Sequence, residues 1–187
     1  MDVFDRAVIF AVKAHEGQRR KRGGAYIIHP LETAAIASTL TDDSEVLAAA
    51  VLHDTVEDAG VTPATLIQEF GERVARLILS ETEDKRADLP PSSTWRIRKE
   101  ESIAILNAST DVNVKIIWLA DKLSNMRAFY RDYIKTGDDL WQRFHQNDPK
   151  EQHWYYRTVA DAVSELSDFP AWKEYDALID KVFEQQL

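Results

Sequence analysis

Ionisable side chains are concentrated in the segment 53–58, which reads His-Asp-Thr-Val-Glu-Asp. The segment follows apolar residues at 48–52, so its charges would be costly to bury without partners. Residues four apart share a helix face, so a continuous helix would place His53 above Glu57 and Asp54 above Asp58. A divalent cation can be the missing partner, because such ions accept imidazole nitrogen and carboxylate oxygen together. A solvated acidic helix end explains this segment equally well when it is considered alone.

Two positions elsewhere in the chain could complete such a site. His29 stands directly before a proline, although an isolated histidine is more often a packing or capping residue than a ligand. Asp121 interrupts an apolar run at 116–119, and Asn125 lies four positions later on the same helix face. The alternative is an exposed Asp121 that pairs with Lys122 or Arg127 in solvent. An aspartate that interrupts a buried-looking run fits this alternative less well.

A histidine, a His-Asp doublet and a distant aspartate on a helical frame resemble the ligand set of the HD phosphohydrolases. Three ordered segments, 18–30, 52–58 and 119–127, are similar to the motifs of the RelA/SpoT hydrolase domain, and the similarity spans about residues 5–130. The first of these motifs is carried by Arg20-Lys21-x-Gly23 and Tyr26-Ile27-Ile28-His29-Pro30. The resemblance implies a stand-alone small alarmone hydrolase, similar to the metazoan SpoT homologues. Such enzymes bind Mn²⁺ and remove the 3′-pyrophosphate of guanosine tetra- or pentaphosphate.

The resemblance also implies a role for each matching residue. One Mn²⁺ per chain would be held by His29, His53, Asp54 and Asp121. The implied catalytic residues, which would orient or deprotonate a water molecule, are Glu57 and Asp58. The implied substrate-binding residues are Arg20, Lys21, Lys122 and Asn125. A set of two nitrogens and two oxygens suits Mn²⁺ better than a thiolate-seeking metal.

Some residues depart from the family pattern, and other functions therefore stay open. The loop 22–25 is unusually basic, Glu81 stands where many relatives carry an apolar residue, and 95–99 is typical of a branch of the family. One alternative is an HD phosphohydrolase acting on an adenine alarmone analogue, NADPH or a nucleoside monophosphate. Others are a non-catalytic nucleotide-binding module and a purely structural helical protein. An intact Glu57–Asp58 pair argues against simple binding.

Composition limits the partners that the protein can have. The 187 residues carry a formal net charge of −9, so binding to nucleic acid or anionic membranes is disfavoured. Attraction of a polyphosphate must then be local, and the cations at 19–22 could supply it, although alone they read as a solvated loop. The absence of cysteine excludes disulfides, zinc fingers and a thiol nucleophile. Neither a signal peptide nor a membrane span is expected, which favours the cytoplasm, and the oligomeric state stays open.

The elements that must position these residues are predicted to be helices. Apolar spacing and capping residues indicate helices from 5, 30, 46, 63, 95, 149 and 170, with the longest loop at 84–93. Residues 112–118 alternate as a strand would, but nothing is available to pair with them, so a helix is expected from Val114. We therefore expect one all-α domain over 1–187, and the resemblance implies that it is an HD-type bundle, with the motifs in about 5–130 and a helical extension at about 138–187. Trp154 and its two tyrosine neighbours are expected in the core.

Overall fold

Helices form the framework of the computed structural model, which describes residues 1–20, 23–86 and 88–183. They are α1 (Val3–Ala14), α2 (Ile28–Ala37), α3 (Ser44–Leu52), α4 (Thr55–Ala59), α5 (Pro63–Phe70), α6 (Glu72–Leu79), α7 (Pro91–Ala108), α8 (Val112–Thr136), α9 (Pro149–Ala162) and α10 (Pro170–Phe183), with 3₁₀ turns at Gly137–Arg143 and Ser164–Leu166. Among these described residues, β-type pairing is limited to one bridge between Arg19 and Ala25. The all-α prediction is confirmed.

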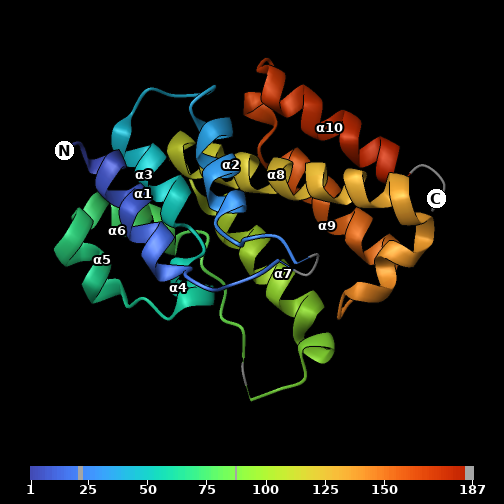
Figure 1. The fold of residues 1–187 in the computed structure, drawn as a ribbon. Helices are drawn as coiled ribbons and strands as arrows, with labels where there is room; N and C mark the ends of the chain where they lie inside the picture. Colours follow the sequence, from blue (N-terminus) through green and yellow to red (C-terminus); the bar gives the residue numbers. More distant parts are fainter. Residues whose placement is uncertain (21–22, 87, 184–187) are drawn as a thin grey trace.

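The long helix α8 is the central element of the fold (Figure 1). It packs against α2, α3, α9 and α10. Ile117, Trp118, Leu119 and Leu123 are fully or almost fully buried on it. Burial on several sides removes the clean helical period, which is why residues 112–118 resemble a strand in the sequence. The expected helix from Val114 is confirmed, and it begins slightly earlier, at Val112.

Several helix starts follow the capping residues in the sequence. The side chains of Asp43, Thr62 and Asp148 each accept a hydrogen bond from a backbone N–H in the first turn of the following helix. Thr62 and Asp148 are each followed by a proline at the first helical position. Gly71, between α5 and α6, has φ +87°, a conformation that favours glycine.

The expected continuous helix from Val46 to about Glu57 is wrong. α3 ends at Leu52, His53 and Asp54 form a turn, and α4 begins at Thr55. Asp54 has ψ −3°, which takes its backbone out of the regular helical conformation. Neighbouring residues on a regular helix point about 100° apart, so this break lets His53 and Asp54 turn toward one point.

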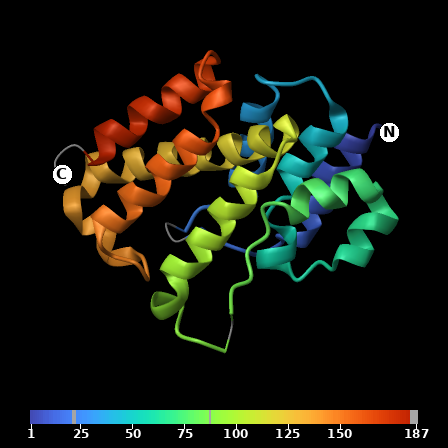
Figure 2. The same cartoon turned by 180° about the vertical axis from the view of Figure 1, so that it is seen from behind.

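The loops differ from the sequence expectation in length. α7 begins at Pro91, so the segment between α6 and α7 covers 80–90 rather than 84–93, and the segment 15–27 between α1 and α2 is longer. Residues 80–86 and 88–90 and the start of α7 lie at the lower edge of the molecule, and Figure 2 shows them from behind. Within the described part of the chain, every helix is too short or too polar to cross a membrane.

Candidate metal centre and substrate cavity

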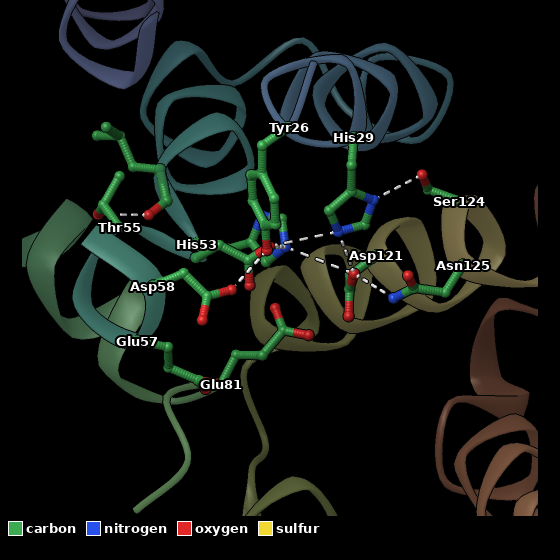
Figure 3. A network of polar contacts seen from close by, with 12 residues as sticks. Tyr26, His29, His53, Thr55, Glu57, Asp58, Glu81, Asp121, Ser124 and Asn125 are labelled. Atoms are coloured by element: carbon green, nitrogen blue, oxygen red, sulfur yellow. Dashed lines mark hydrogen bonds and ion pairs between the residues drawn. The ribbon is translucent and has the colours of Figure 1, made fainter. Parts of the chain in front are cut away.

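Side chains from three places in the fold meet at one point (Figure 3). His29 comes from the first turn of α2, His53 and Asp54 from the turn after α3, and Asp121 from the middle of α8. His29 Nε2 lies 3.0 Å from Asp121 Oδ1 and 3.5 Å from Asp54 Oδ2. His53 Nε2 lies 3.4 Å and 3.2 Å from the same two oxygens. Two nitrogens and two oxygens thus converge, with both histidines and Asp121 buried.

Hydrogen bonds at the far side of each imidazole fix its orientation. Ser124 donates its hydroxyl hydrogen to Glu32 at 2.9 Å, so its oxygen accepts from His29 Nδ1 at 2.8 Å. His53 Nδ1 donates to the carbonyl oxygen of Ala50 at 2.8 Å. In each neutral ring the Nε2 lone pair therefore faces the cluster, the arrangement that an imidazole metal ligand requires.

The electrostatics of the cluster fit a divalent cation. His53 Nε2 is buried and makes no hydrogen bond, although two carboxylates face it. Burial opposes protonation of His53, but the charges of Asp54 and Asp121 outweigh it and raise its pKa well above the ordinary value. The lone pair therefore needs a positive partner, which can be a proton or a metal ion. Imidazole nitrogen with carboxylate oxygen suits hard or borderline divalent ions such as Mn²⁺ or Fe²⁺.

The two oxygens of Asp121 have different partners. Oδ1 faces the histidines and accepts a hydrogen bond from Asn125 Nδ2 at 2.8 Å. Oδ2 pairs with the ammonium of Lys122, which lies 4.7 Å from the Trp118 ring centroid. Burial would raise the pKa of Asp121, but the charge of Lys122 and the histidine contacts hold it well below its usual range. Asp121 is thus kept ionised, with one oxygen available to a cation.

Glu57 and Asp58 have different surroundings. Glu57 lines the cavity beside the histidines, and its Oε1 accepts a hydrogen bond from the backbone N–H of Glu83 at 2.6 Å. Burial raises the pKa of Glu57 above the ordinary glutamate value. In Asp58, Oδ1 pairs with Lys85 and Oδ2 accepts from the Tyr26 hydroxyl at 2.6 Å. Glu57 therefore faces the cavity with its Oε2 3.6 Å from Lys85 Nζ, whereas both Asp58 oxygens make closer contacts, with Lys85 and Tyr26.

Two adjoining cavities lie next to the cluster. The first measures about 190 Å³ and has largely polar walls that include the two histidines, Lys99 and Lys122. The second measures about 300 Å³ and is more apolar, with Phe129 in its wall. The walls shared by both cavities are formed by Arg20, Tyr26 and Asn125. The guanidinium of Arg20 donates to Asn125 Oδ1 at 3.1 Å and lies 5.6 Å from the Tyr26 ring centroid.

The structure places the expected substrate-binding residues in different surroundings. Arg20 and Asn125 lie between the two cavities, whereas Lys21 is outside the described residues. Lys122 lines the first cavity, but its ammonium is already paired with two carboxylates, those of Asp121 and Glu81. Arg127 binds Glu174 through two nitrogens, at 2.6 and 2.7 Å, so it braces α8 against α10.

Several residues of the site were not singled out from the sequence. Tyr26 donates toward both Asp54 and Asp58, at 2.7 and 2.6 Å, and its place within the first motif was a usable signal. Lys85 and Lys99 come from the 80–90 segment and α7, where nothing in the spacing marks them. The expected burial of the aromatic group holds for Tyr155 and Tyr156, and Tyr155 also lines the first cavity, whereas Trp154 is half-buried beneath Arg96.

A helical frame that brings a histidine, a His-Asp pair and a distant aspartate together defines the class of HD-domain phosphohydrolases. The HD-domain family model matches residues 7–148, and the chain belongs to that family.

Within this class, the chain is similar to RelA/SpoT proteins. A GTP pyrophosphokinase of Brucella melitensis is 35% identical over 125 residues, covering 67% of this chain and 16% of the relative. The guanosine-3′,5′-bis(diphosphate) 3′-pyrophosphohydrolase of Aquifex aeolicus is 37% identical over 125 residues, covering 67% of this chain and 17% of the relative. The chain thus spans about one sixth of the length of these curated relatives.

Two solved structures resemble the whole chain or most of it. One is described as "A metazoan ortholog of SpoT hydrolyzes ppGpp and plays a role in starvation responses"; it has a TM-score of 0.73, is 25% identical and covers 100% of this chain and 96% of its own. The other is a protein of Listeria monocytogenes, with a TM-score of 0.72 and 30% identity, covering 83% of this chain and 99% of its own.

Proposed function

We propose that this protein is a Mn²⁺-dependent hydrolase that removes the 3′-pyrophosphate of guanosine 3′,5′-bis(diphosphate) or its pentaphosphate analogue, releasing GDP or GTP and pyrophosphate. The observation that carries the proposal is the meeting of His29, His53, Asp54 and Asp121 beside a polar cavity. The match to a metazoan SpoT ortholog along the whole chain supports the choice of substrate. We further propose that the protein works in the cytoplasm.

The four converging residues would hold one cation per chain. When bound, a divalent cation polarises a phosphoryl oxygen and lowers the pKa of a water molecule beside it. Asn125 and Lys122 would keep Asp121 oriented and ionised, while Ser124 and Ala50 would hold the two imidazoles.

Glu57 would act as the general base. It faces the cavity, and its raised pKa brings its proton affinity closer to what a base needs near neutral pH. Asp58 would be a positioning residue, because Lys85 and Tyr26 occupy its oxygens. Through Tyr26, Asp58 is linked to Asp54.

The nucleotide would extend from the first cavity into the second. Its 3′-pyrophosphate would lie in the polar cavity, within reach of Lys99. The base would enter the more apolar cavity, where Arg20 can stack on its plane and Phe129 offers an aromatic wall. Asn125, which faces both cavities, could hydrogen-bond the ribose between them.

A nucleotide panel tests this proposal against the alternatives. Mn²⁺-loaded protein is incubated with guanosine 3′,5′-bis(diphosphate), its adenine counterpart, NADPH, GTP and GMP, and the products are separated by chromatography. We expect GDP and pyrophosphate from the first compound and no change in GTP, which lacks a 3′ phosphate. Cleavage of only NADPH or the monophosphate would replace this function with that of another HD phosphohydrolase. Binding of every nucleotide without turnover would favour a sensor module.

A further inference from the structure

Glu81 places a buried carboxylate in the wall of the polar cavity. It lies two residues after the end of α6, and Figure 3 shows its side chain extending toward the space beneath His53 and Asp121. Oε1 accepts a hydrogen bond from the ammonium of Lys122 at 3.2 Å. Oε2 is buried and has no hydrogen-bond partner.

This arrangement is energetically unfavourable as a packing solution. A buried acceptor without a partner carries a desolvation penalty, and a neutral side chain of similar size would avoid it. Burial raises the pKa of Glu81 to about 7 despite the opposing charge of Lys122. A costly group that faces a reactive cavity is a candidate for a functional role.

The other charges of the cavity are better balanced. Glu83 pairs with Arg98 and with Lys99, the latter at 2.6 Å. Asp121 pairs with Lys122. Lys122 is therefore shared between two carboxylates, and it is the cation of the described cavity wall that pairs with Glu81, through Oε1 alone.

The negative charge of Glu81 has opposite effects on a bound cation and on a bound phosphate. A nearby carboxylate attracts a divalent cation and repels a phosphate anion, and in a cavity with few waters both effects exceed those in bulk solvent. Without the Glu81 carboxylate, Lys122 would lose one hydrogen-bond acceptor. Its side chain would stay in place, because Asp121 and the Trp118 ring still contact it.

We propose that Glu81 is a specificity-determining residue that strengthens cation binding and weakens phosphate binding, so that it limits the negative charge which the cavity accepts. Removal of its charge therefore changes the two affinities in opposite directions. The inference rests on the cation site of the proposed function but not on the guanine nucleotide, so it can fail or hold independently of the substrate.

Calorimetry with Mn²⁺ alone and then with inorganic phosphate on Mn²⁺-saturated protein tests the inference at pH 8. In Glu81→Gln and Glu81→Leu we expect the Kd for Mn²⁺ to rise and the Kd for phosphate to fall, each by about tenfold, the order of magnitude for one unit charge across a solvated cavity. Glu165→Gln is the matched control, because Glu165 pairs with Lys115 at 2.6 Å on an exposed surface and should change neither affinity.

A structural role of Glu81 gives a different pattern. If both affinities weaken together in Glu81→Gln, the residue merely supports the fold and the inference is overturned. Unchanged affinities would also overturn it, because the charge would then not reach the bound ions. Circular dichroism and the melting temperature identify any variant that fails to fold, and the isosteric Glu81→Gln decides the outcome in that case.

Discussion

Chemistry in this cavity depends on which atom of each residue faces the centre. Asp121 offers one oxygen to the cluster and the other to Lys122. Both histidines present Nε2 to the centre because Nδ1 is hydrogen-bonded on the other side of the ring, to Ser124 in His29 and to Ala50 in His53. Glu57 faces the cavity, whereas its neighbour Asp58 is tied to Tyr26 and Lys85. These atomic roles lead to two predictions about single residues.

Glu57→Gln keeps the shape of the side chain and removes its basic oxygen. We expect kcat to fall by roughly 10²-fold or more, the usual size of a general-base contribution, while the metal content stays unchanged. In the wild type, activity should fall as the pH drops through the raised pKa of Glu57, because protonation removes the base. This fall should therefore occur at a higher pH than the pKa of an ordinary glutamate. Steady-state kinetics against pH measure both effects. Near-normal turnover of Glu57→Gln would show that Glu57 is not the general base.

Ser124→Ala removes the hydroxyl that receives the His29 Nδ1 hydrogen. Loss of such an outer partner usually lowers metal affinity by about 10- to 100-fold. We expect a weaker Mn²⁺ Kd by calorimetry, with kcat at saturating Mn²⁺ much less affected. Ser38→Ala, at an exposed helix end, is the control. Equal Mn²⁺ affinity in both variants would show that Ser124 does not orient the ligand.

The helices bring residues together that are far apart in the chain. α8 and its contacts with α2 and α3 position Asp121 opposite His29 and His53. The capping residues Asp43, Thr62 and Asp148 made several helix starts predictable, because a cap acts on its own first turn.

Other features depend on tertiary contacts and could not be read from local patterns. The break at Asp54 has no proline or glycine to announce it, and it is supported by the contacts of Asp54 with the histidines and Tyr26. The partners of Lys85 lie 27 and 28 residues away, so only the folded 80–90 segment defines them. Sequence motifs therefore indicated the cluster and its neighbours Glu57 and Asn125, but not Lys85 or Lys99.

A cation held by α2, the α3–α4 turn and α8 should stabilise the fold. We expect Mn²⁺ to raise the melting temperature and a chelator to reverse the shift, since a ligand at 100 times its Kd contributes about 2.7 kcal/mol. Asp54→Ala should lose most of the shift, and differential scanning fluorimetry measures it. A shift of the same size in Asp54→Ala would place the stabilising ion at another site.

On the scale of the whole molecule, a net charge of −9 opposes the approach of a polyphosphate. Arg20 is one of the few cations on the cavity walls, and it contacts Asn125 between the two cavities. We expect Arg20→Ala to raise KM by about tenfold with a smaller change in kcat, because binding is lost while the metal chemistry remains. The difference in KM between Arg20→Ala and the wild type should shrink in high salt, because salt screens the charge of Arg20. A fall in kcat of about tenfold with an unchanged KM would contradict a binding role.

In the proposed function, Glu57 would activate a water molecule for attack on the phosphorus next to the 3′ oxygen of the nucleotide, beside the four residues that would hold the cation. Mass spectrometry of the products from guanosine 3′,5′-bis(diphosphate) cleaved in ¹⁸O-labelled water tests it most directly. Attack at that phosphorus breaks its bond to the ribose 3′ oxygen, so pyrophosphate should carry one labelled oxygen and GDP none. Release of orthophosphate, label in GDP, or an unchanged nucleotide in the presence of Mn²⁺ would contradict the claim.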